Sequence, residues 1–213
     1  MIAYTIEAAL ECDLFEQVNV STEDEEIAQI VREHGAAVPY MRPHDLATDQ
    51  AGVVEVCLHM LDFFKSRGQT YDVMGVLLPS SPLRNAADIR GTYERFLKAD
   101  ADYAMAVTPY LHPPWQALVE QNGYLRPYWG PEIAHKKSQE IPELWVDTGA
   151  VYFAKVSAFR HDQTFYGRRL VGYPIAPERA IDVDNSFQLC IARLLMRDVT
   201  QARSSNEKQL KES

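Results

Sequence analysis

Apolar residues along the chain follow two spacings, one typical of helices and one of short strands. Ile2, Ile6 and Leu10 recur every four residues, which places them on one face of a helix. Helical spacing also predicts helices at about residues 51–65, 86–99 and 186–196. Short apolar runs predict strands at residues 18–20, 37–40, 71–78, 103–107, 149–154 and 170–175.

A further helix is predicted to begin within residues 21–26. A hydroxyl followed by an acid three residues later is the pattern of a capping box. Ile27, Ile30 and Val31 are expected to line its buried face, and Gly35 to end it.

The alternation of strands and helices predicts a layered α/β sheet with crossover connections. Residues 71–78 form a continuous apolar run, as expected for a strand that is covered on both faces. We expect one domain at residues 1–199, followed by a polar tail at 200–213. Residues 109–147 are rich in Pro, Gly, Tyr and Trp and have no clear period, which predicts an inserted flap.

Composition narrows the function classes. The formal net charge of −9 argues against sequence-independent nucleic-acid binding, which depends on phosphate neutralisation by Lys and Arg. No apolar stretch approaches the roughly 20 residues of a membrane span, and the first residues lack the basic start of a signal peptide. We therefore expect a soluble cytoplasmic protein whose three cysteines are reduced core thiols.

Asp182 and Asp184 are the acids with the strongest chemical pattern. On an extended segment, residues two apart share one face, so both carboxylates would point the same way. Such a pair suits Mg²⁺ held together with the phosphates of a nucleotide. The alternative is that Asp184 only caps the helix that follows it.

Two loops carry candidate phosphate or sugar contacts. Ser80, Ser81 and Arg84 lie in a turn after the most apolar strand, where ligands of open α/β sheets bind. The alternative is a proline-bounded turn in which Ser81 caps a neighbour. Arg42 lies in a similar loop and is either a bidentate phosphate ligand or a surface charge.

Seven runs resemble, in order and spacing, the acylneuraminate (nonulosonic acid) cytidylyltransferase family, the enzymes of the CMP-sialic acid synthetase type. The runs are residues 2–10, 20–28, 42–49, 79–84, 136–142, 148–152 and 178–184. The resemblance implies a three-layer Rossmann-like nucleotidyltransferase fold, of the nucleotide-diphospho-sugar transferase type, with a small dimerisation flap. It also implies a homodimer that transfers CMP from CTP, with Mg²⁺, to the anomeric hydroxyl of an acidic nine-carbon sugar and releases pyrophosphate.

Site residues follow from the resemblance by position. Asp182 and Asp184 match the catalytic, metal-binding aspartates of the family. The residues expected to bind the nucleotide are Arg42, Ala51, Ser80 and Ser81. Those expected to bind the acidic sugar are Lys137, Gln139, Thr148, Tyr152, Phe165 and Tyr166.

The chain departs from the family pattern in ways that affect substrate and activity. Leu78 replaces a glutamine, Thr148 replaces an asparagine, and Lys136 with Lys137 replaces a pair of arginines. Sialic, legionaminic and pseudaminic acids therefore all stay open as substrates. The family's first strand and glycine-rich phosphate loop have no counterpart in these 213 residues, so we expect no CMP transfer by this chain alone. The alternative function is that of a non-catalytic sugar-binding or dimer scaffold subunit.

Overall fold

The computed structural model describes residues 1–48 and 50–197; the predicted tail at 200–213 lies outside the described residues. The α-helices are α1 (Ile2–Glu11), α2 (Glu25–Glu33), α3 (Val53–Lys65), α4 (Ala86–Lys98), α5 (Pro131–Ala134) and α6 (Val156–Asp162). Residues 186–197 are also helical. The strands are β1 (Val73–Val76), β2 (Tyr103–Pro109), β3 (Leu118–Gln121), β4 (Tyr124–Pro127), β5 (Trp145–Lys155) and β6 (Leu170–Pro174). Short 3-10 helices lie at His44–Leu46, Pro114–Gln116, Ser138–Glu140 and Pro177–Arg179.

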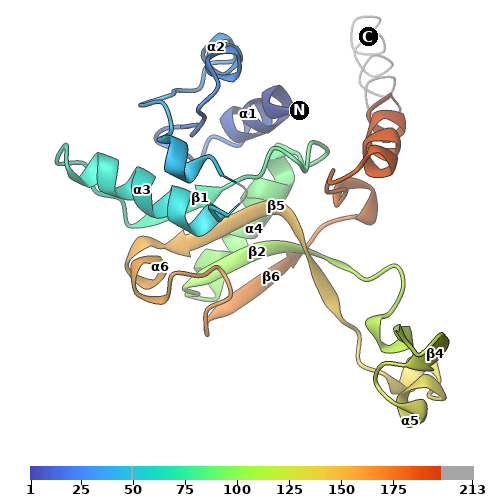
Figure 1. The fold of residues 1–213 in the computed structure, drawn as a ribbon. Helices are drawn as coiled ribbons and strands as arrows, with labels where there is room; N and C mark the ends of the chain where they lie inside the picture. The colour runs from blue at the N-terminus through green and yellow to red at the C-terminus, as the bar shows by residue number, and fades with distance from the viewer. Residues whose placement is uncertain (49, 198–213) are drawn as a thin grey trace, which may run out of the picture.

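The main sheet has four strands in the order β1-β5-β2-β6 (Figure 1). Strand β5 is antiparallel to both β1 and β2, whereas β2 and β6 are parallel. Strands β1, β2 and β6 therefore run in one direction, and their carboxyl ends face the same edge of the sheet. Two extended segments of the first 42 residues pair in parallel through isolated bridges, Asn19 with Ala37 and Thr22 with Met41.

Helices cover both faces of this sheet, which gives three layers (Figure 1). Side chains of β2 and β5 alternate between two cores, as the pleat requires. On one face, Ala104 and Phe153 pack with Ile89 and Phe96 of α4 and with Ala8 of α1. On the other face lie side chains of α3, α6 and the strands, among them Leu61, Phe159, Tyr103, Met105 and Tyr152. The predicted layered α/β fold is confirmed.

Helix α2 differs in detail from its prediction. It begins within the predicted range, but its N-cap is Asp24, which accepts a hydrogen bond from the Ile27 N–H at 3.0 Å, and not the predicted hydroxyl. Val31 is buried in a small core against α1, whereas Ile27 and Ile30 are 38% and 39% exposed. The predicted burial of the two isoleucines was wrong, because α1 covers only the side of α2 that carries Ala28 and Val31.

Strand β1 is shorter than the predicted run of residues 71–78, but its side chains pack on both faces of the sheet, as expected. Val73 packs against the core that contains α4, and Met74 and Val76 pack against the other core. All four residues are only partly buried. Among the described strands, β1 pairs only with β5 and lies at an edge of the sheet, where fewer neighbours shield its side chains.

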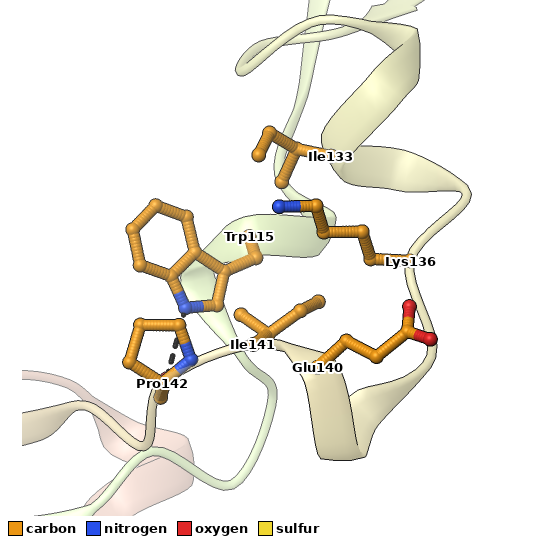
Figure 2. A pocket seen from close by; sticks show the side chains of 6 residues that line it. All are labelled: Trp115, Ile133, Lys136, Glu140, Ile141 and Pro142. Atoms are coloured by element: carbon orange, nitrogen blue, oxygen red, sulfur yellow. Dashed lines mark hydrogen bonds between the residues drawn. The ribbon is translucent and has the colours of Figure 1, made fainter.

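Residues 110–144 leave the sheet between β2 and β5 and form a projecting flap (Figure 1). The flap contains the β3–β4 hairpin and α5, and Trp115 and Trp129 hold it together. The Trp115 indole N–H donates to the Pro142 carbonyl at 3.2 Å, beside a pocket of about 40 Å³ that Ile133 and Ile141 help to line (Figure 2). The flap is therefore held by aromatic and hydrogen-bond contacts of its own, and none of its residues whose burial is described is buried.

No helix within the described residues has the length and apolar character that crossing a membrane requires. The three cysteines are unpaired, but only Cys12 is buried, whereas Cys57 is partly buried and Cys190 is exposed. The prediction that all three are core thiols was therefore wrong for Cys190, which lies on the exposed side of helical residues 186–197.

Candidate functional site

A wide bulge in β5 forms the floor of the candidate site. Met105 pairs with Tyr152 and Val107 pairs with Asp147, so residues 148–151 lie opposite Ala106 alone. The Thr148 hydroxyl donates to the Ala106 carbonyl at 2.9 Å and fixes the bulge to β2. Bulges of this kind redirect side chains, and they are common beside functional sites.

The turn after β1 is bonded to this bulge. Ser81 is fully buried, and its hydroxyl donates to the Thr148 carbonyl at 2.9 Å. Thr148 is itself only 3% exposed. In this structure both hydroxyls donate to main-chain carbonyls, so the nucleotide contact of Ser81 and the sugar contact of Thr148 stay predictions. Ser80 is partly exposed, and its carbonyl accepts from the Val183 N–H at 2.9 Å.

The hydrogen bond between the Val183 N–H and the Ser80 carbonyl brings Asp182 close to the turn after β1 and to the bulge in β5. A methyl group on Gly149 would lie 3.1 Å from Asp182 Oδ2 and 3.3 Å from Ser81 Oγ, so the three residues are close neighbours. Asp182 Oδ1 is buried and has no hydrogen-bond partner among the described residues. A buried carboxylate oxygen without a partner is costly, and its presence calls for a ligand, an ion or water.

Asp184 is exposed and does not cap the last helix. Asn185 does so, because its side chain accepts from the Gln188 N–H at 3.0 Å. The Gln188 side chain in turn accepts from the N–H groups of Asp184 and Asn185, at 2.9 and 3.1 Å. The capping alternative for Asp184 is therefore wrong, and its carboxylate takes no part in the cap.

Asp182 could help to hold a magnesium ion that is shared with a substrate, and the participation of Asp184 stays a prediction. Within the described residues, no group of three or more His, Cys, Asp or Glu side chains could hold a metal. Mg²⁺ commonly binds through one or two carboxylates together with substrate phosphates and water. The unpartnered Oδ1 of Asp182 agrees with such a donor set.

Arg84 places a buried positive charge beside Asp182. It is 3% exposed, and one guanidinium N–H donates to the Leu78 carbonyl, whereas Nε and Nη1 have no partner among the described residues. Burial lowers the Arg84 pKa to about 10, while the charges of Asp182 and Asp88 oppose that shift. Arg84 therefore lies under the turn, where it offsets the charge of Asp182.

Asp147 is a site residue that the sequence analysis missed. Its Oδ2 accepts from the hydroxyls of Tyr152 and Tyr166, each at 2.7 Å, and its Oδ1 accepts from the Gly149 N–H at 3.0 Å. Burial, followed by the bond to Asp147, raises the pKa of Tyr152 far above its usual value and that of Tyr166 to about 12. Phe165 packs on Tyr152 with ring centroids 4.9 Å apart. Three predicted sugar-binding residues, Tyr152, Phe165 and Tyr166, are thus brought together. The only signal in the sequence was an acid directly before Thr148 and Gly149.

Arg42 belongs to a second group of residues. Its guanidinium donates to the Ser21 carbonyl at 3.1 Å and pairs with Glu23 at 2.9 Å. Arg42 and Glu23 line a cavity of about 400 Å³ together with His44 and Ala47, a volume within the range of small-molecule pockets. Ala51 is partly buried just before α3, and its N–H donates to the Thr48 carbonyl at 3.0 Å.

Lys137 and Gln139 lie on the flap, and both are exposed. The Lys137 N–H donates to the Glu140 carboxylate at 3.2 Å, a contact within the flap. Figure 1 shows the flap projecting away from the sheet, and the sugar contacts of these two residues stay predictions.

Comparison with known protein families matches residues 1–112 to the family described as Cytidylyltransferase. The chain belongs to the cytidylyltransferase family. Among curated relatives, the pseudaminic acid cytidylyltransferase of Campylobacter jejuni is 27% identical over 199 residues, which are 92% of this chain and 85% of the relative. The CMP-N,N'-diacetyllegionaminic acid synthase of Legionella pneumophila is 28% identical and covers 92% of this chain and 84% of its own. The N-acylneuraminate cytidylyltransferase of Escherichia coli is 27% identical over 90% of this chain, which spans 45% of that longer protein.

Solved structures agree with the cytidylyltransferase assignment at the level of the fold. CMP:2-keto-3-deoxy-manno-octonic acid synthetase, solved in complex with CTP, matches with a TM-score of 0.63 at 14% identity over 92% of this chain and 87% of its own. 4-diphosphocytidyl-2C-methyl-D-erythritol synthase matches with a TM-score of 0.60 at 11% identity over 91% of this chain and 88% of its own. The chain therefore has the α/β nucleotidyltransferase fold of these two enzymes.

Proposed function

We propose that this protein transfers CMP from CTP to the anomeric hydroxyl of a nonulosonic acid and releases pyrophosphate. The observation that carries the proposal is the position of Asp182. In a chain of the cytidylyltransferase family, its unpartnered carboxylate oxygen lies beside Gly149 and Ser81, close to the turn after β1. The relatives named above, which act on pseudaminic, legionaminic and acylneuraminic acids, support this class of sugar.

Asp182 and Asp184 would hold Mg²⁺, which neutralises phosphate charge when it is bound. The chain's own residues contribute positioning. The Ser80 carbonyl and the Val183 N–H join the turn to the aspartate segment, and Arg84 offsets the charge of Asp182 from below. The sugar oxygen forms its bond to the α-phosphorus as the bond to pyrophosphate breaks, a reaction in which positioning and charge supply most of the catalysis.

The cavity beside Arg42 is proposed as part of the nucleotide pocket. Its volume of about 400 Å³ and its polar lining of Arg42, Glu23 and His44 suit one section of a nucleotide. Ser80, Ser81 and Ala51 remain proposed neighbours of the nucleotide, and Tyr152, Phe165 and Tyr166 of the sugar.

We also propose that the protein is a homodimer joined through the flap. Several large apolar side chains of the flap are exposed, namely Leu111, Leu118, Tyr124, Leu125, Tyr128 and Trp129. Exposed apolar groups on this scale are typical of an interaction surface. The flap also carries Lys137 and Gln139, so a dimer joined through it would hold these two proposed sugar contacts at or near the interface.

The proposal is tested with the 213 residues alone and with a fusion that places the first strand and glycine-rich phosphate loop of a relative ahead of Met1. Each is incubated with CTP, Mg²⁺ and, in turn, pseudaminic, legionaminic and N-acetylneuraminic acids. The expected result is pyrophosphate release and a CMP-sugar product from the fusion, with CTP and not with ATP, and none from the 213 residues alone. The kinetic experiments below use the fusion. Binding of a sugar without turnover would favour the sugar-binding alternative. A protein that binds neither CTP nor any of the three sugars would overturn both functions.

A further inference from the structure

The bonds around Asp147 fix the direction of two tyrosine hydroxyls. Both hydroxyls lie 2.7 Å from the same oxygen, Asp147 Oδ2. A carboxylate only accepts hydrogen bonds, so Tyr152 and Tyr166 must be the donors. With those protons directed at Asp147, the lone pairs of each phenolic oxygen remain as hydrogen-bond acceptors, well exposed on Tyr166 and largely enclosed on Tyr152.

Asp147 is itself held firmly. Its Oδ1 accepts from the Gly149 N–H at 3.0 Å, inside the bulge that Thr148 bonds to β2. Tyr152 is 8% exposed and packed in the core, whereas Tyr166 is 66% exposed. The mostly exposed ring of Tyr166 therefore depends on the Asp147 bond for its position.

Charges near these tyrosines disfavour an anion. Asp147 carries both tyrosine bonds, and Asp182 lies close enough to Tyr152 to raise that hydroxyl's pKa further. Arg84, the cation beside Asp182, is buried and bonded to Leu78, and Lys137 lies on the projecting flap. A ligand carboxylate would be repelled here, whereas an N–H or O–H group would find two acceptors.

We propose that Asp147 is a positioning residue that presents Tyr152 and Tyr166 as hydrogen-bond acceptors, and that this pair selects a hydroxyl or acylamino group of the sugar and excludes its carboxylate. The inference rests on the proposed function, because it concerns the sugar end of the same site. Beyond that function, the inference identifies the chemical groups of the sugar that face the tyrosine pair.

A first test needs no catalysis. Tyrosine ionisation is followed by ultraviolet absorbance, with Tyr166→Phe identifying the signal of Tyr166. Asp147→Asn should lower the Tyr166 pKa from about 12, because the carboxylate that stabilises the protonated hydroxyl is gone. An unchanged Tyr166 titration in Asp147→Asn would overturn the positioning role.

A second test uses sugar analogues in which one hydroxyl or acylamino group at a time is replaced by hydrogen. One analogue should lose about three- to tenfold in kcat/KM, the effect of one hydrogen bond. That loss should disappear in Tyr166→Phe or Tyr152→Phe, where the acceptor is missing. A loss that persists in both variants would contradict the selection of a donor group.

Asp147→Asn should raise the KM for the sugar about three- to tenfold and leave the KM for CTP unchanged. Asp162→Asn is a matched control, because Asp162 accepts a tyrosine hydroxyl bond from Tyr103 at 2.8 Å outside the site, and it should change neither value. If the sugar is turned over but Asp147→Asn changes the KM for the sugar and the KM for CTP equally, this inference is refuted and the proposed function is not. Failure of every sugar to react or bind would refute the proposed function as well.

Discussion

Gly149 lies so close to Asp182 that a Cβ at this position would be only 3.1 Å from the carboxylate Oδ2. Gly149 also has a φ of +65°, in the left-handed region that favours glycine. Both features come from the bulge of β5, so the strand geometry and the position of the acidic side chain depend on the same residue. A side chain at Gly149 would disturb both.

We expect Gly149→Ala to lower the free energy of unfolding by about 1–2 kcal/mol and to reduce activity through displacement of Asp182. Urea unfolding and steady-state kinetics measure the two effects. Gly123→Ala is the matched control, because Gly123 has a φ of +80° but a Cβ there would meet no atom within 4 Å. Equal losses of activity in the two variants would show that the contact with Asp182 has no role.

Arg179 donates two hydrogen bonds to the Asp88 carboxylate, of 2.8 and 3.0 Å. Asp88 is 2% exposed and also belongs to the capping box of α4 with Asn85. Arg179 lies three residues before Asp182, so this pair ties the aspartate segment to the start of α4.

Arg179→Met should lower the free energy of unfolding by about 1–3 kcal/mol, because it removes both hydrogen bonds from a charged donor to the buried Asp88 carboxylate. It should also raise the Mg²⁺ concentration needed for half-maximal activity, since Asp182 loses its anchor. Asp62→Asn breaks the exposed Arg160–Asp62 pair of 2.7 Å and should cost less than about 1 kcal/mol, with no change in metal requirement. A metal requirement that stays constant in Arg179→Met would count against the anchoring role.

Local pattern was enough to predict the long helices. Helices α1, α3 and α4 begin and end within two residues of their predicted positions, because each carries a continuous apolar face. Helix α6 was missed, since its seven residues follow β5 directly and no side chain caps its start. The exposure of Ile27 and Ile30 was also missed, because periodicity identifies an apolar face but not which part of it a neighbour covers.

The site depends on contacts that no local pattern encodes. Ser81 meets Thr148 across 67 positions of sequence, and Asp182 reaches Gly149 only through the order of strands in the sheet. The role of Asp147 depends on a bulge, which leaves residues 148–151 opposite one residue of β2. Alternation along a strand cannot predict such an irregularity.

Asp182→Asn should reduce turnover by about a hundredfold or more, because it removes a charged ligand from the reacting phosphates. Asp184→Asn should act in the same direction. Calorimetry with Mn²⁺ in place of Mg²⁺, in the presence of CTP, should show weaker metal binding in both variants, and thermal unfolding confirms that they are folded. Full metal binding in the two folded variants would place the ion elsewhere.

The flap gives the last prediction. Leu125 is 67% exposed on β4, among other exposed apolar side chains of the flap. Light scattering at tens of micromolar should give the mass of a dimer, and Leu125→Glu should weaken the dimer about thirtyfold, because a charge at the centre of an apolar interface loses its solvation. Leu97→Glu is the control, since Leu97 is 55% exposed on α4, outside the flap. Its mass should stay that of a dimer. A monomer in the unaltered protein, or equal effects of the two variants, would refute the flap as the interface.

If the dimer supplies flap residues to the site, Leu125→Glu should also raise the KM for the sugar more than the KM for CTP, because Lys137 and Gln139 belong to the same flap.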